Sequence, residues 1–393
     1  MINKKAYADC LHYIQNYWDK LICYYPKDKQ LHFGLPNKFI TANAFIFKND
    51  QFYWDSYFII LGLLKSKKIT LAKGMVDNFC FMFKRFGIIP MRNRYYNLGT
   101  SQIPFLTSMI LEIFSVDKDV PWLRKSMKIA ELELEKYWMN ENLVEKHIVY
   151  KGLSRYCDHH ITHLGSEHES GWDMTSRFND RCLDYLPIDL NTCLYKYQID
   201  LAETYRLIKN QNKHKHYKEQ AEKRKKQIIS LMWNDKSKFF FDFNLLKKKK
   251  STFYSVAGFY PLWAKLATEK QAHMIRKYAL PLFEQEGGIV NTRRFGLSKD
   301  IKQHDYPNGW PPQQWIVIKG LLNYGFRGDA ERIARKWLEM NARIFRETGN
   351  FWEKYNVVKC EVGIQNQNRY PTQIGFGWTN AIFVWLVNEF NLK

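Results

Sequence analysis

The chain has 393 residues, of which 46% are hydrophobic and 16% aromatic, a composition that supports a large core and excludes an intrinsically disordered protein. Its formal net charge of +21 suggests an anionic partner, but the lysines are spread along the chain and their dense runs suit an exposed helix and a turn. No basic run alternates with aromatic residues as a single-strand-binding groove requires, so we expect no nucleic acid partner.

Apolar residues recur at helical spacing in one segment after another. In chain order the predicted helices cover residues 6–19, 55–65, 71–85, 102–114, 121–137, 190–209, 217–233, 256–266, 271–282, 312–324, 329–346 and 378–390. The alternation typical of strands is scarce, and residues 239–243 are the main candidate. No Pro- or Ser-rich linker divides the series. The sequence therefore predicts an all-α protein with a single domain over residues 1–393.

The cysteines and the N-terminal sequence both favour a location in the cytoplasm. The seven cysteines are scattered without a Cys-x-x-Cys pair, which is typical of free thiols in a reducing environment. The first residues lack the apolar segment of a secretion signal, and no apolar run reaches the roughly 20 residues that span a bilayer. We therefore expect a cytoplasmic protein without a membrane partner.

Four acidic residues lie beside aromatic residues in the predicted loops, namely Asp55, Asp173, Asp305 and Glu353. Each could simply cap a helix. Glycoside hydrolysis, however, needs two carboxyl groups facing each other across the scissile bond, and an apolar wall such as Trp172 disfavours the charged form of an acid. Paired helices whose functional loops gather at one end are typical of an (α/α)₆ barrel, the architecture that we expect.

The order of the short motifs resembles the trehalase family of glycoside hydrolases from about residue 53 to residue 380. The motifs that carry the resemblance include Trp54-Asp55-Ser56-Tyr57-Phe58, Gly171-Trp172-Asp173, Asp305-Tyr306-Pro307-Asn308-Gly309-Trp310, Glu353-Lys354-Tyr355 and Gly375-Phe376-Gly377-Trp378. The resemblance implies an inverting hydrolase on an (α/α)₆ barrel, without a metal or an organic cofactor.

The resemblance also implies roles for individual residues. Asp173 corresponds to the general acid and Glu353 to the general base, and the charge of Lys354 would help to keep Glu353 ionised. Inversion requires the two carboxyl groups to lie roughly 6.5 to 9.5 Å apart. The residues expected to bind the sugar are Trp54, Asp55, Asn93, Arg94, Gln102, Trp172, Arg177, Asp305, Trp310, Phe376 and Trp378.

Several positions depart from the family pattern. The family's Asn-Gly-Asn-Arg is Met91-Arg92-Asn93-Arg94 here, and Thr100 stands where an arginine is expected. His304 replaces a tryptophan, and the arginine of the Pro-Gly-Gly-Arg-Phe motif is absent from residues 45–50. Changes in groups that grip sugar hydroxyls alter substrate discrimination.

The loop before Gly171 is shorter than in the family and rich in histidine. It contains His159, His160, His163 and His168 together with Asp158 and Glu167, but the spacing fits no usual zinc pattern. We interpret these histidines as replacements for lost sugar-binding groups, or as groups that adjust the proton affinity of Asp173.

The leading hypothesis is a cytoplasmic α,α-trehalase that produces two glucose molecules with inversion. The first alternative is a related hydrolase of another small α-glycoside, such as glucosylglycerate or mannosylglycerate, because the missing arginines change the site. The second is a carbohydrate-binding protein without catalytic activity. The partner is in each case a small carbohydrate, and the sequence carries no expectation about the oligomeric state.

Overall fold

A computed structural model describes residues 4–143, 146–295, 302–363 and 371–392. The helices are α1 (Lys4–Leu21), α2 (Tyr53–Lys65), α3 (Ile69–Phe86), α4 (Leu106–Asp117), α5 (Val120–Glu133), α6 (His163–Glu169), α7 (Ile188–Leu207), α8 (Gln211–Met232), α9 (Tyr260–Trp263), α10 (Glu269–Met274), α11 (Pro311–Asn323), α12 (Arg327–Thr348) and α13 (Gly377–Glu389).

Single-turn helices extend or connect these elements. They are η1 (Tyr95–Asn97), η2 (Leu134–Trp138), η3 (Ser176–Phe178), η4 (Cys182–Asp184), η5 (Val256–Phe259), η6 (Ile275–Ala279) and η7 (Leu280–Leu282). The strands are short and antiparallel, namely β1 (Ile22–Cys23), β2 (Phe39–Ile40), β3 (Ile148–Tyr150), β4 (Leu153–Ser154), β5 (Tyr185–Leu186), β6 (Trp233–Asn234), β7 (Phe239–Phe240), β8 (Phe243–Asn244), β9 (Lys249–Lys250), β10 (Glu284–Gln285), β11 (Gly288–Ile289), β12 (Asn308–Gly309), β13 (Tyr355–Asn356) and β14 (Glu361–Val362).

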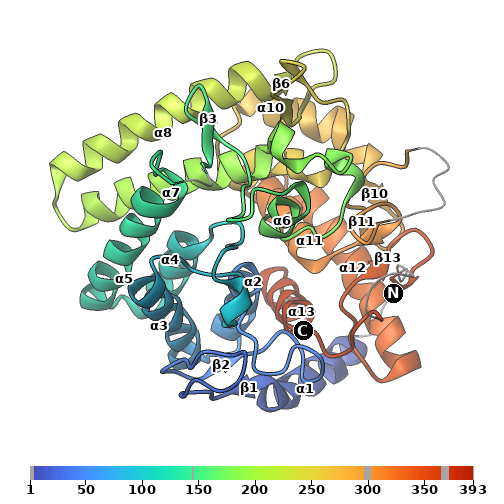
Figure 1. Ribbon diagram of the computed structural model, residues 1–393. Coiled ribbons are helices and arrows are strands. Elements are labelled where there is room, and N and C mark those ends of the chain that lie inside the picture. The colour runs from blue at the N-terminus through green and yellow to red at the C-terminus, as the bar shows by residue number, and fades with distance from the viewer. Residues whose placement is uncertain (1–3, 144–145, 296–301, 364–370, 393) are drawn as a thin grey trace.

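The helices form a closed ring (Figure 1). In the inner layer α2 contacts α4, α4 contacts α7, and the contacts continue through α9, α11 and α13 back to α2. In the outer layer α3 packs on α2 and α4, α8 packs on α7, and α12 packs on α11 and α13. This arrangement is the (α/α)₆ barrel that the sequence predicted.

The sequence of each helix explains which layer it joins. On α2 every residue from Tyr53 to Leu63 is buried, and on α13 every residue from Gly377 to Val387 is buried. A helix that is hydrophobic on all sides is stable only when protein surrounds it. On α12 the buried residues instead recur at intervals of three and four, which leaves one face to solvent.

The ring closes through a close approach between its first and last inner helices. A Cβ atom at Gly62 of α2 would lie 2.4 Å from the Cα atom of Ala381 on α13, so only glycine fits at this position. The N-terminal ends of α2 and α13 also lie side by side, because the rings of Trp54 and Trp378 in their first turns are 5.8 Å apart.

The predicted helices are present, with differences at their ends. Helix α4 begins at Leu106 rather than at residue 102, because Pro104 disfavours helical backbone in the residue before it. The predicted helix 271–282 is divided into α10, η6 and η7, the last of which contains Pro281. Helix α6 was not predicted, since its seven residues are too few to show a helical period.

The structure also bears on the strand and the membrane spans considered from the sequence. The strand expected over residues 239–243 is observed as β7 and β8, which belong to two different sheets. Among the described residues, no helix has the length and the apolar composition needed to cross a membrane.

The buried carboxyl group of Glu133 joins three helices. Glu133 lies on α5 and accepts hydrogen bonds from the hydroxyl groups of Tyr53 (2.9 Å) on α2 and Tyr197 (2.6 Å) on α7, and from the indole nitrogen of Trp138 (3.3 Å). Burial raises the pKa of Glu133 to about 7. The native state therefore holds this proton at pH values where an unfolded glutamate has lost it.

The free energy of unfolding should consequently fall as the pH rises from about 4.5 to about 7, by roughly 3 kcal/mol from this group. The variant Glu133→Gln lacks the titration, so its stability relative to the wild type should increase across the same window. Urea unfolding at several pH values measures the difference. Glu135→Gln, which removes an exposed carboxyl group from the adjoining turn, is the matched control. Parallel pH profiles for the wild type and Glu133→Gln would contradict the prediction.

Candidate active site

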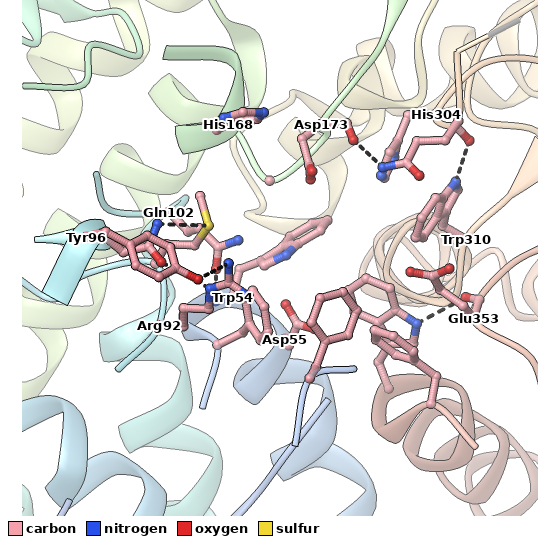
Figure 2. A pocket seen from close by; sticks show the side chains of 18 residues that line it. Trp54, Asp55, Arg92, Tyr96, Gln102, His168, Asp173, His304, Trp310 and Glu353 are labelled. Carbon is pink, nitrogen blue, oxygen red and sulfur yellow. Dashed lines mark hydrogen bonds between the residues drawn. The ribbon is translucent and has the colours of Figure 1, made fainter. Parts of the chain in front are cut away.

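A pocket of about 470 Å³ lies at the N-terminal ends of the inner helices α2, α11 and α13. Its walls include most of the residues that the sequence predicted, which are Trp54, Asp55, Gln102, Asp173, Trp310, Glu353, Phe376 and Trp378. Figure 2 shows the carboxyl groups of Asp55, Asp173 and Glu353 directed toward the same space from different elements. The barrel thus gathers three acidic side chains that lie far apart in the sequence.

Asp55 is in the first turn of α2, and its side chain is only 4% exposed. Burial raises the pKa of this carboxyl group well above its usual range, and the negative charges of Asp173 and Glu353 raise it further. The positive charge of Arg92 acts in the opposite direction. Asp55 is therefore suited to hold a proton and to donate a hydrogen bond.

Glu353 is buried and is held by its neighbours in the sequence and by α13. The ammonium group of Lys354 donates to its carboxyl group at 3.3 Å, and the backbone nitrogen of Gln373 donates at 3.4 Å. The backbone of Glu353 is bound to Gln373 (2.8 Å) and accepts from the indole nitrogen of Trp378 (3.1 Å). The contact with Lys354 that the sequence suggested is present, and it supplies a cation beside the carboxylate.

Short paired strands hold the segment of Glu353 beside the segment of Trp310. Strand β12 pairs with β13, so that Gly309 lies opposite Tyr355. Trp310 directly follows β12, and the ammonium group of Lys354 lies 5.0 Å from the centre of the Trp310 ring. Two motifs that are separated by more than forty residues in the sequence are thereby placed side by side.

Asp173 lies in a turn that follows α6. Gly171 adopts a φ of +73°, and a Cβ atom there would lie 2.9 Å from the ring of Trp54, so glycine is needed at this position. Gln303 donates from its side chain to the backbone oxygen of Asp173. The carboxyl group of Glu167 accepts from the backbone nitrogen of Thr175 at 2.8 Å. These contacts hold the acid at the wall of the pocket.

Three residues that we expected to bind sugar lie behind the Asp173 turn instead of in the pocket wall. Asp305 accepts from Thr175 (3.1 Å) and from the hydroxyl group of Ser176 (2.7 Å). Trp172 is fully buried, and the guanidinium group of Arg177 lies 4.9 Å from its ring centre. Their positions favour support of the turn over contact with a sugar.

Arg177 is the centre of this support. Its buried guanidinium group binds Asp189 at 2.7 Å and Asp242 at 2.6 Å. Asp242 also accepts from the backbone nitrogen of Ile188, at the start of α7. The salt bridges therefore tie the turn that carries Asp173 to an inner helix of the barrel.

Asn93 and Arg94 are likewise outside the pocket wall. Asn93 is buried and accepts from the backbone nitrogen of Gln51 at 2.8 Å, while Arg94 binds the carboxyl group of Asp50 at 2.7 Å. Both side chains hold the segment that leads into α2. The adjacent Arg92, a departure from the family's glycine, lines the pocket in their place.

The pocket also contains residues that the sequence analysis did not assign to it. They are Phe47, Phe52, Met91, Arg92, Tyr96, Asn97, Gly171, Gln303 and His304. The ring of His304 stacks on Trp310 with 4.0 Å between the ring centres. Arg92 and His304 are departures from the family pattern, and these departures could have indicated that both residues lie in the pocket.

The four histidines of the loop before Gly171 lie in different surroundings. His168 lines the pocket, whereas His163 accepts from the backbone nitrogen of Leu183 at 3.2 Å, and His159 and His160 are exposed. Within the described ranges, no group of three or more histidine, cysteine or acidic residues could hold a metal ion. Only His168 is placed to take over from a lost sugar-binding group.

A barrel of paired helices with carboxyl groups and tryptophans at its mouth is the architecture of the (α/α)₆ carbohydrate enzymes. The family model for trehalase matches residues 3–163 and 158–391, and the chain belongs to the trehalase family. It is 33% identical to a cytosolic neutral trehalase of Beauveria bassiana over 422 aligned residues and 33% identical to one of Saccharomyces cerevisiae over 414. These alignments cover 86% of the chain but only 56% and 55% of the relatives, so the chain spans about half of their length.

Solved structures show the same relationship. The neutral trehalase of Saccharomyces cerevisiae matches with a TM-score of 0.78 and 30% identity, covering 89% of this chain and 73% of that one. A mannosylglycerate hydrolase from Thermus thermophilus matches with a TM-score of 0.68 and 15% identity, covering 96% of this chain and 99% of that one. The second match shows a shared fold.

The buried salt bridges of Arg177 predict a large effect on stability. The variant Arg177→Met leaves Asp189 and Asp242 buried without their cation, which should lower the free energy of unfolding by about 3 to 5 kcal/mol. Arg181→Met is the matched control, because Arg181 lies in the same segment and its side chain is exposed in its ion pair with Asp184. The control should cost less than about 1 kcal/mol. Denaturant unfolding measures both, and equal losses would contradict the assigned role of Arg177.

Proposed function

We propose that the protein is an inverting trehalase, which hydrolyses α,α-trehalose to two glucose molecules in the cytosol. The observation that carries this proposal is the convergence of Asp173, Glu353 and Asp55 on one pocket with tryptophan walls. Membership in the trehalase family and the similarity to cytosolic neutral trehalases support it. The proposed catalytic domain comprises residues 1–393, because the barrel closes only when α13 returns to α2.

In the proposed mechanism Asp173 is the general acid. Its side chain is partly exposed to the pocket, where it can donate a proton to the glycosidic oxygen as the bond to the first sugar breaks. The turn that carries it is clamped by Glu167, Gln303 and Asp305. Fixed placement of the acid lowers the barrier, since little reorganisation is left for the transition state.

Glu353 is the proposed general base. It is buried on the opposite wall, where its carboxylate would remove a proton from a water that attacks the anomeric carbon. Lys354 holds the carboxylate and supplies a positive charge beside it. Attack from the side opposite to the leaving oxygen inverts the configuration, and it requires a separation of roughly 6.5 to 9.5 Å between the two carboxyl groups, which stays a prediction.

The aromatic residues of the pocket form one continuous wall. The rings of Trp54 and Trp378 lie 5.8 Å apart, and those of Trp310 and Trp378 lie 5.6 Å apart, both at near-perpendicular angles. Flat apolar rings of this kind suit the C–H faces of a sugar, and the carboxyl group of Asp55 next to them suits its hydroxyl groups. The substrate is accordingly a small carbohydrate, and the proposed chemistry uses no cofactor.

Exchange of either catalytic carboxyl group should remove most of the activity. For Asp173→Asn and Glu353→Gln we expect kcat for trehalose to fall by about 10² to 10⁴, because general acid and base catalysis each contribute that much. An enzymatic assay of glucose release measures the loss. Asp180→Asn, in the exposed part of the same segment as Asp173, is the control and should retain near-normal activity. Wild-type protein that releases no glucose from trehalose would sink the proposal.

A second candidate is the hydrolysis of glucosylglycerate or mannosylglycerate, which the environment of Arg92 favours. The carboxyl group of Asp50 is shared by Arg92 (3.0 Å) and Arg94 (2.7 Å), so the two arginines retain an excess positive charge. Arg92 also donates to Asn97 and Tyr96, each at 3.0 Å. A guanidinium group in the pocket wall can hold sugar hydroxyls, and it suits the carboxylate of a glycerate group even better.

The position of Arg92 in the pocket wall yields a prediction about substrate binding. For Arg92→Met we expect KM for trehalose to rise about tenfold or more with little change in kcat, because a charged hydrogen bond made in both ground and transition states is lost. Arg94→Met is the matched control, since Arg94 binds the same Asp50 outside the pocket wall. Equal effects of both variants would show that Arg92 acts only through Asp50. Wild-type activity on glucosylglycerate with none on trehalose would favour the second candidate.

A further inference from the structure

A second pocket, of about 430 Å³, lies on the outer side of the barrel. It is formed by α7, α8 and the turn between β3 and β4, which lie next to one another in Figure 1. None of its residues belongs to the wall of the proposed active site. Its lining contains four cationic side chains and no acidic one.

Arg224 of α8 is the buried cation of this pocket, with only 4% of its surface exposed. Its guanidinium group donates to Asn191 (3.0 Å) and Gln198 (3.3 Å) and contacts the sulfur of Met139. All three partners are neutral. Among the described residues, no carboxylate forms an ion pair with Arg224, and burial alone lowers its pKa to about 10, so that it stays positively charged near neutral pH.

Arg177 shows how the same fold treats a buried guanidinium group that has a counter-charge. Arg177 is balanced by Asp189 and Asp242, whereas Arg224 has only neutral acceptors. A buried charge without a partner of opposite sign is costly. Arg224 moreover uses one N–H of each nitrogen in its three contacts, which leaves one N–H on each terminal nitrogen for a ligand.

The mouth of the pocket adds three more cations. Lys151, Lys223 and Lys226 line it and are exposed. The side-chain amides of Gln198, Gln220 and Gln227 also line it and can donate hydrogen bonds. A fixed guanidinium group at the base, with mobile ammonium groups at the rim, is a combination that attracts and holds an oxyanion.

We propose that this pocket binds a small oxyanion of the phosphate class, either inorganic phosphate or the phosphate group of a small phosphorylated metabolite. Arg224 binds two oxygens of the anion with its remaining N–H groups, and Lys223 and Lys226 neutralise its outer side. The site is separate from the sugar pocket, and the proposal does not depend on the activity proposed above.

The contacts of Arg224 also show what a bound anion would stabilise. Asn191, which accepts from Arg224, lies in the first turn of α7 and donates to the backbone of Ser154 on β4 at 2.8 Å. The same turn contains Asp189, the partner of Arg177. An anion that neutralises Arg224 would therefore favour the packing of α8 and β4 against the start of α7.

The test is a calorimetric titration of the purified protein with sodium phosphate, at an ionic strength held constant with sodium chloride. We expect one site with a dissociation constant in the millimolar range or tighter, and a melting temperature that rises by a few degrees at saturating phosphate. A hexose phosphate titrated in parallel distinguishes the source. Tighter binding of the ester indicates a phosphorylated metabolite, and equal binding indicates free phosphate.

Matched variants locate the site. The double variant Lys223→Gln with Lys226→Gln should weaken phosphate binding about tenfold or more, since each ion pair with an anion at a partly buried site contributes appreciably. The double variant Lys215→Gln with Lys218→Gln removes the same charge from exposed positions of α8 outside the pocket, and it should leave binding unchanged. Arg224→Met should abolish binding, and the lysine variants carry the test if that variant fails to fold. No binding beyond that of chloride, or equal losses in both double variants, would overturn the proposal.

Discussion

The structure depends on the constraint that three carboxyl groups share one largely buried pocket. Burial raises the pKa of Asp55 well above its usual range, and repulsion by the negative charges of Asp173 and Glu353 raises it further. The fold offsets this repulsion with a cation on each side. Lys354 binds Glu353, and Arg92 acts on Asp55 from the opposite wall. The three carboxyl groups therefore have different neighbours, which suits a pocket in which the proposed acid and the proposed base take different roles.

The barrel provides the rigidity that this arrangement needs. The inner helices α2 and α13 are buried on all sides over most of their length, and the glycine at position 62 lets them pack closely against each other. Behind the pocket, Arg177 and its two aspartates hold the turn of Asp173 against α7. The proposed catalytic side chains therefore lie on loops, but buried salt bridges and helix packing hold those loops in place.

The sequence predicted those features that leave a pattern in it, such as a helical period or an ordered set of motifs. Helical periodicity located the long helices, and the motif order placed Asp173 and Glu353 in one site. The seven-residue α6 has no detectable period. Polar motif residues such as Arg177 and Asp305 were expected to bind sugar, yet they lie outside the pocket wall and form hydrogen bonds with protein groups behind it. The difference depends on the direction of a side chain in the folded chain, and neighbouring residues in the sequence do not reveal it.

Inverting hydrolysis by Asp173 and Glu353 is the central claim, and the configuration of the first products tests it most directly. Proton NMR during the first turnovers of the wild-type protein on α,α-trehalose resolves the two anomers of glucose before they equilibrate. Inversion at one anomeric carbon should give equal amounts of β-glucose and α-glucose at the start, since the leaving sugar keeps its configuration. Release of α-glucose alone would mean retention and would contradict the assigned roles, as would the absence of any glucose.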